Sequence, residues 1–141
     1  MSDAFGSIEH AEPTRGIMRW IIAALYFVAG IIHLARPEPF LAITPDWVPY
    51  PGVVIFLSGL FELAVALALL TRRFRRAAGI AMAVYALCVW PANFKHAIDS
   101  FAMASGDWRW WYHVPRLALQ PVIVWWALFS ASVIDWPLRR R

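Results

Sequence analysis

Four long apolar runs alternate with short polar segments along the chain. About 20 mainly apolar residues cross a bilayer as an α-helix, and each run reaches or approaches that length. The pattern therefore predicts an all-α fold, a bundle of four transmembrane helices. The predicted helices cover about residues 17–35, 52–71, 77–94 and 117–134. A polar segment, 1–15, precedes them. Because no repeat or linker is visible in the sequence, residues 1–141 are expected to form a single domain.

The composition favours a membrane protein over a soluble one. Hydrophobic residues make up 61% of the chain and charged residues 16%, against about 45–50% and about 25% in soluble domains. Four apolar runs in 141 residues leave too little polar sequence to coat a water-soluble surface. The single cysteine, Cys88, excludes an internal disulfide and cysteine-rich metal centres, and we expect it to be an inert apolar residue of the third helix.

The basic residues are distributed unevenly between the two predicted sides of the membrane. Nine arginines share one side with both termini, and four basic residues lie on the other side. The positive-inside rule assigns the richer side to the cytoplasm, so both termini are expected there. A prokaryotic inner membrane is the expected location. The segment before the first helix lacks the pattern of a secretory signal, so that helix is expected to be retained. Nucleic-acid binding is not expected, because no soluble domain presents the arginines.

Glu62 is the acidic residue inside the second apolar run. It lies ten residues after Gly52 and ten before Arg72, which puts it about 15 Å from either face of the bilayer. An ionised carboxylate there costs at least about 2.5–3.5 kcal/mol. Glu62 should therefore face the bundle interior, find a partner or be protonated. Ser58 and Gly59 share its helical face, and Glu62 is the best candidate for a catalytic group.

Polar residues of the other helices lie mostly toward the outer side. We expect the helices to enclose a pocket that opens outward, with Glu62 as its floor and the proline-rich loop 36–51 as a cap. The other candidate ligand-binding residues are Tyr26, His33, Ser58, Trp90, Asn93, Arg116 and Gln120. In an alternative interpretation these groups satisfy one another and hold the helices together in lipid. Arg116 could also extend to the membrane interface.

Three histidines are candidate metal ligands, because neutral imidazole is a common ligand. They are His33, His96 and His113. No two of them have the i, i+3 or i, i+4 spacing that would place both on one helix face. The spacing therefore does not predict a metal site.

The order of these motifs resembles the DoxX-like family of small membrane proteins. The first helix ends in AGIIHLARPEPF at 29–40, and TPDWVPYP follows at 44–51. LSGLFEL at 57–63 is similar to the family's Ser-Gly-x-x-Glu pattern, and WPAN at 90–93 and RLALQ at 116–120 come later in the chain. The resemblance implies a four-helix bundle. It implies little about chemistry, because relatives range from subunits of quinone-linked sulfur-oxidising complexes to animal cargo receptors.

Three functions fit these predictions. The first is a binding or assembly subunit that holds a partner protein or a lipid-like ligand in the pocket. The second is a membrane subunit of a quinone-linked oxidoreductase, with quinone as the cofactor and Glu62 as a proton relay. A partner would have to supply its electrons, because the chain shows no haem or iron–sulfur ligation pattern. The third is a small proton-coupled transporter. The isolated chain is not expected to be an enzyme, and its partners would be the bilayer, another subunit or a second copy.

Overall fold

The computed structural model describes residues 3–103 and 108–137, and the described part of the chain contains helices and no strands. The all-α prediction is therefore confirmed for these residues. Four helices are long, and a short one caps the first connection. The elements are α1 (Asp3–Ala35), α2 (Glu38–Ile43), α3 (Pro51–Leu70), α4 (Arg75–Met103) and α5 (Trp108–Ser130).

Three of the long helices are long and apolar enough to cross a membrane, which indicates a membrane protein. Within the described residues these candidate spans are Pro13–Ala35, Pro51–Leu70 and Arg75–Ala102. Helix α5 is not among them, although 117–134 was predicted as a span. Its helical part ends at Ser130, so the apolar residues that follow lie outside it.

The ends of the helices differ from the predicted ranges for local reasons. Helix α1 begins at Asp3, within the segment predicted to be a polar extension, because a polar sequence can continue a helix beyond its apolar part. Helix α5 ends early because Ser132 has a left-handed backbone, with a φ of 58°. The N–H of Val133 then donates to the carbonyl of Leu128 and closes the last turn.

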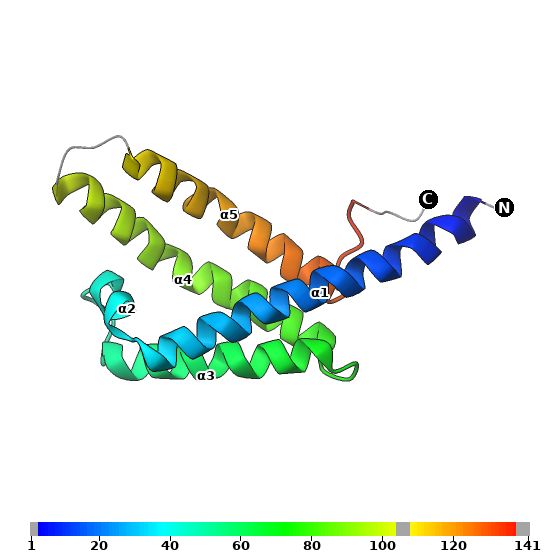
Figure 1. Cartoon of the computed structure of the whole chain (residues 1–141), viewed down its shortest axis with the longest axis horizontal. Coiled ribbons are helices and arrows are strands. Elements are labelled where there is room, and N and C mark those ends of the chain that lie inside the picture. Colours follow the sequence, from blue (N-terminus) through cyan, green and yellow to red (C-terminus); the bar gives the residue numbers. More distant parts are fainter. Residues whose placement is uncertain (1–2, 104–107, 138–141) are drawn as a thin grey trace.

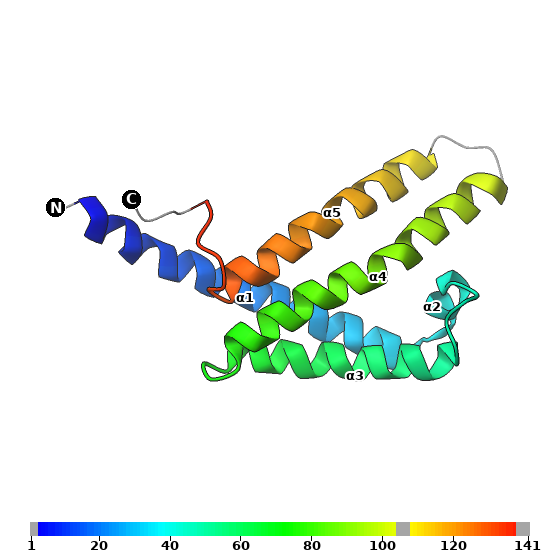
Figure 2. The same ribbon diagram turned by 180° about the vertical axis from the view of Figure 1, so that it is seen from behind.

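The four long helices form two pairs that diverge from one end of the molecule. Helix α1 packs mainly against α3, and α4 packs mainly against α5. Figures 1 and 2 show the two pairs meeting near the α3–α4 turn and separating toward the end that carries α2. The described ends of α1 and of the chain after α5 lie beyond the meeting point (Figure 1). We call the meeting point the closed end and the α2 side the open end.

The buried core lies at the closed end. Ile22, Leu69 and Met82 are fully buried there. A Cβ atom on Gly79 would collide with the side chain of Ala131, so α4 and the end of α5 approach each other closely. Because the pairs are held together at this end, the space between them widens toward α2.

Hydrogen bonds also fasten α1 to the end of α5. Nη2 of Arg15 lies 2.7 Å from a carboxylate oxygen of Asp135. Nε of Arg19 donates to the carbonyl of Ser130 at 2.9 Å, and Nε1 of Trp126 donates to the carbonyl of Met18 at 3.0 Å. These charged and polar contacts stabilise the closed end where a purely apolar interface would gain little in lipid.

Candidate functional site

A close contact between two glycines sets the geometry of the site. A Cβ atom on Gly30 of α1 would lie 2.8 Å from the carbonyl oxygen of Gly59 in α3. The two backbones can therefore meet only because Gly30 has no side chain, while Gly59 leaves room for the side chains of His33 and Leu34. His33 and Glu62 each follow one of these glycines by three residues, on the same face of their helices. The glycine contact thus brings the imidazole and the carboxylate together.

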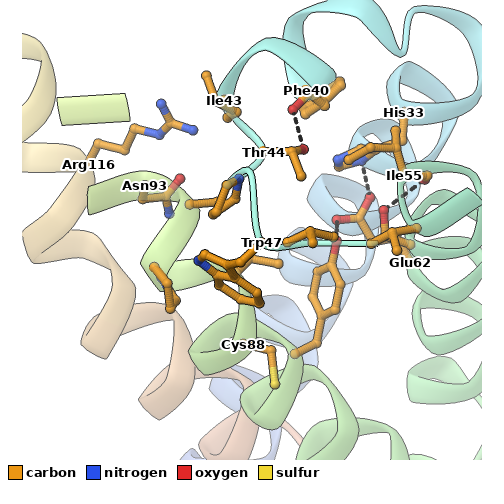
Figure 3. Close-up of a pocket in the computed structure, with 18 residues that line it drawn as sticks. His33, Phe40, Ile43, Thr44, Trp47, Ile55, Glu62, Cys88, Asn93 and Arg116 are labelled. Carbon is orange, nitrogen blue, oxygen red and sulfur yellow. Dashed lines mark hydrogen bonds and ion pairs between the residues drawn. The ribbon is translucent and has the colours of Figure 1, made fainter. Parts of the chain in front are cut away.

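Glu62 is buried, with 5% of its surface exposed, and both of its carboxylate oxygens have partners. Oε2 lies 2.7 Å from Nδ1 of His33, and Oε1 accepts a hydrogen bond from the hydroxyl of Tyr85 at 2.8 Å. The three side chains come from α1, α3 and α4. Figure 3 shows both hydrogen bonds of Glu62 as dashed lines. Glu62 therefore faces the interior and has partners, as its position in the sequence predicts. We call Glu62, His33 and Tyr85 the acidic triad.

The orientation of His33 is fixed by three neighbours. Its Nδ1 lies 3.1 Å from the carbonyl oxygen of Ala29 as well as near Glu62. A carbonyl oxygen can only accept, so Nδ1 carries the hydrogen and Nε2 is the remaining ring nitrogen. The ring also stacks on Phe40 of α2, with centroids 3.7 Å apart. His33 is thus positioned to offer Nε2 as an acceptor, or as a donor when the ring is protonated.

A cavity of about 320 Å³ lies beside the acidic triad, between α2, the loop after it, α3 and α4. Figure 3 shows His33 and Glu62 on one side of this cavity and Asn93 and Arg116 on the other. Large apolar side chains form much of the remaining wall. They are Phe40, Ile43, Trp47, Val48, Val54 and Val89. The cavity therefore has two polar sides separated by an apolar middle, and residues of the proline-rich loop form part of its wall, as predicted.

The structure divides the expected single pocket into two cavities. His33, Ser58, Asn93 and Arg116 line the first cavity with Glu62. Tyr26 and Gln120 line a second cavity of about 230 Å³ between α1, α4 and α5, which Glu62 and Tyr85 also reach. Trp90 lines neither cavity, and its ring packs against Phe94 with centroids 5.6 Å apart. The division arises because the side chains of the acidic triad fill the middle of the bundle.

Asn93 and Gln120 fit the alternative in which polar groups satisfy one another. Nδ2 of Asn93 donates to Oε1 of Gln120 at 3.4 Å, and Nε2 of Gln120 donates to the carbonyl of Ala86. These contacts tie α4 to α5 across their interface. Gln120 is buried by this arrangement, so its amide serves the packing of the pair.

The three candidate metal-binding histidines do not converge. Nη1 of Arg116 donates to Nδ1 of His96 at 2.7 Å, which uses the lone pair a metal would need. The ring of His113 lies 4.9 Å from that of His96, whereas His33 belongs to the acidic triad. Among the residues that the structure describes, no three His, Cys, Asp or Glu side chains are grouped to hold a metal ion.

Tyr85 and Cys88 were not among the predicted site residues. Tyr85, Val89 and Asn93 follow one another at four-residue spacing and share a face of α4, a pattern that could have revealed the tyrosine. Cys88 was expected to be an apolar packing residue, but it is exposed and lines the first cavity. A tyrosine or a cysteine in an apolar run does not indicate a site by itself. Only the side chains around it in the folded protein show whether it belongs to one.

The fold and the buried acidic triad define a helical membrane protein with an internal, partly polar cavity. A family model described as Domain of unknown function (DUF8561) matches residues 22–131, and the chain belongs to this family. The match extends from α1 beyond the end of α5 and includes the whole acidic triad. None of the curated proteins and none of the solved structures matches the chain. The resemblance to the DoxX-like family stays a prediction.

Proposed function

We propose that this protein binds a lipid-like molecule in the first cavity, beside the acidic triad. The observation that carries this proposal is the cavity itself, about 320 Å³ in volume, with an apolar middle and a buried hydrogen-bonding group on one side. Binding sites for small molecules have this character, with mainly apolar walls and a few fixed polar groups. A molecule with an apolar body and a polar group matches such walls.

The triad determines what a bound molecule would meet. Both oxygens of Glu62 are hydrogen-bonded, one to His33 and one to Tyr85, which lowers the cost of burying the carboxylate. Nε2 of His33 keeps hydrogen-bonding capacity for a ligand, and so do the second lone pairs of the Glu62 oxygens. A hydroxyl or carbonyl group on the ligand could bond to this nitrogen, or to Asn93 or Arg116 on the opposite side of the cavity.

The proposed arrangement in the membrane includes all four long helices. Helix α5 packs against α4, and its residues after Arg116 are mainly apolar, which supports a fourth transmembrane helix. The arginine-rich turn at 72–76 lies at the closed end. The positive-inside rule then puts the closed end and both termini in the cytoplasm and directs the open end outward. A prokaryotic inner membrane remains the proposed location.

The resemblance to DoxX-like proteins supports a role as a subunit, so the binding of a partner protein or of a second copy is part of the same proposal. The second candidate function is a quinone-linked oxidoreductase subunit. It is favoured by the hydrogen-bonded path from His33 through Glu62 to Tyr85, which connects the two cavities and could carry a proton. A partner would supply the electrons. The same path would serve a proton-coupled transporter.

Cys88 allows a direct test of the proposed cavity, because it is the one cysteine of the chain and lines the cavity wall. The protein is reconstituted in nanodiscs, and the rate of alkylation by N-ethylmaleimide is measured at increasing concentrations of dodecanol. We expect dodecanol to slow the alkylation of Cys88 in a saturable way. The control has Cys88→Ser with Val84→Cys, because Val84 is exposed and lines neither cavity.

The control variant should be alkylated at the same rate with and without dodecanol. Equal slowing at both positions would mean that dodecanol acts on the bilayer and not on the cavity. That result, or unchanged alkylation of Cys88 at saturating dodecanol, would contradict the proposed function. For the quinone candidate, the same assay with decylubiquinone should show tighter protection than dodecanol, and equal or weaker protection would count against it.

A further inference from the structure

We infer that the molecule held in the first cavity is an anionic amphiphile, with its head group bound by Arg116 and its alkyl chain directed toward the acidic triad. This inference rests on the proposed function and adds the chemical class of the ligand. It depends on an asymmetry of charge within the cavity. One side carries a guanidinium group, and the other carries a carboxylate that is hydrogen-bonded to His33 and Tyr85.

Arg116 has neutral partners in the described part of the chain. Its Nη1 donates to Nδ1 of His96 at 2.7 Å and to the hydroxyl of Tyr112 at 3.4 Å. The ion pairs found among the described residues involve other groups; Asp99, for example, is bound to Lys95 at 2.6 Å. A half-buried guanidinium with neutral partners keeps its full charge, and an anion would compensate it.

Arg116 also has the hydrogen-bonding capacity to hold such an anion. A guanidinium group has five N–H donors in a planar fork that suits a carboxylate or a phosphate. The two hydrogen bonds described above both start at Nη1, so Nε and Nη2 retain donors. Figure 3 shows the guanidinium at the edge of the cavity, near Asn93. The anion would lie at this edge with the cavity beside it.

The acidic triad fixes the direction of the ligand. A second carboxylate near Glu62 would be repelled, because like charges in a medium of low dielectric constant interact strongly. Most of the cavity wall is apolar and includes Val48, Val54 and Val89. An alkyl chain fits such a wall, whereas a charged head group does not. The head group is therefore directed to Arg116 and the chain toward the triad.

The test compares head groups on one alkyl chain in the Cys88 alkylation assay. The probes are dodecanoate, dodecyl phosphate, dodecanol and dodecyltrimethylammonium, each used at matched concentrations in the membrane. For the wild type we expect dodecanoate or dodecyl phosphate to protect Cys88 at about tenfold lower concentration than dodecanol, as a charge-assisted hydrogen bond contributes. The better of the two anions identifies a carboxylate or a phosphate head group.

Variants of arginine residues separate the cavity from general membrane charge. Arg116→Gln should abolish the tenfold preference for the anion while dodecanol still protects Cys88. Arg116→Lys should keep part of the preference, and its folding is checked by the same dodecanol protection. The control is Arg36→Gln, since Arg36 is exposed and does not line the cavity, and it should keep the full preference.

The outcomes distinguish this inference from the proposed function. Equal protection by dodecanoate, dodecyl phosphate and dodecanol in the wild type would overturn the anionic head group and leave the binding cavity intact. Stronger protection by dodecyltrimethylammonium would also overturn it. A preference that persists in Arg116→Gln would remove Arg116 from the site. No protection by any probe would contradict both proposals together.

Discussion

Nδ1 of His33 and Oε2 of Glu62 lie 2.7 Å apart, although 29 positions separate the two residues in the chain. The contact depends on Gly30 and Gly59, which precede them by one helical turn and let α1 and α3 approach closely. A packing motif and a polar pair are therefore one structural unit. The unit places a buried acid at the side of a cavity where three helices meet.

The glycine contact predicts the effect of adding a single methyl group. Gly30→Ala would bring a Cβ atom to 2.8 Å from the backbone oxygen of Gly59, which a flexible side chain cannot relieve. We expect a loss of about 1–3 kcal/mol in the free energy of unfolding, as for other overpacked sites. Thermal unfolding in detergent micelles measures the change.

Gly16 provides the matched control on the same helix, because a Cβ atom there would meet no atom within 4 Å. Gly16→Ala should leave the stability unchanged or raise it by about 0.5–1 kcal/mol through the higher helix propensity of alanine. Equal effects of the two substitutions would show that α1 and α3 do not meet at Gly30.

The two bonds of Glu62 predict different outcomes for two substitutions. In Glu62→Gln the amide oxygen can accept from Nδ1 of His33, and the amide nitrogen can donate to the hydroxyl oxygen of Tyr85. We expect this variant to unfold within about 1 kcal/mol of the wild type. Glu62→Leu removes a partner from two half-buried groups, of which Nδ1 of His33 keeps the Ala29 carbonyl and the Tyr85 hydroxyl loses its bond to Glu62. It should lose about 1–3 kcal/mol. Glu38→Gln, at an exposed position, is the control. A stable Glu62→Leu variant would contradict the hydrogen bonds described.

Tyr85 lines both cavities and predicts a change in ligand length. Tyr85→Ala should join the two spaces, so that a longer chain such as hexadecanol protects Cys88 more strongly relative to dodecanol than it does in the wild type. Tyr85→Phe keeps the ring between the cavities and should retain the wild-type preference. The ratio of protection by the two alcohols is the measurement. An unchanged ratio in Tyr85→Ala would mean that the tyrosine does not limit the cavity.

The direction in which the cavity opens predicts which side of the membrane gives access to Cys88. A membrane-impermeant maleimide should label Cys88 in right-side-out vesicles faster than in inverted vesicles. Arg72→Cys in a Cys88→Ser background reports the opposite side, since Arg72 is exposed in the arginine-rich turn. It should be labelled faster in inverted vesicles. Labelling of both cysteines from the same side would contradict the proposed orientation.

The apolar runs were enough to predict the helices but not their limits. Membrane helices follow from unbroken hydrophobic sequence, whereas the start of α1 at Asp3 and the end of α5 at Ser130 depend on local backbone geometry. The end at Ser130 follows from the left-handed conformation of Ser132. Such a conformation is uncommon outside glycine and asparagine, so the sequence contains no clear signal for it.

The site was predictable where the free-energy cost of burying a charged side chain requires a hydrogen-bonding partner. Glu62 in an apolar helix requires an interior position, and His33 and Ser58 were expected near it. Tyr85 was missed because a tyrosine in a membrane helix is equally suited to packing or to the interface. The division into two cavities depends on the triad side chains, because Glu62 and Tyr85 line both spaces. The helix pairs that position them are joined by hydrogen bonds such as those of Arg19 to Ser130 and of Trp126 to Met18, which spacing alone does not reveal.

Photo-crosslinking tests most directly the claim that a lipid-like molecule binds beside the acidic triad. A dodecanol with a diazirine in its chain is irradiated with the protein in nanodiscs, and the modified residues are mapped by mass spectrometry. The account predicts adducts on cavity residues such as Val48 and Val89 that excess dodecanol removes. Adducts confined to lipid-facing residues such as Val84 and Leu67, with no competition by dodecanol, would contradict it.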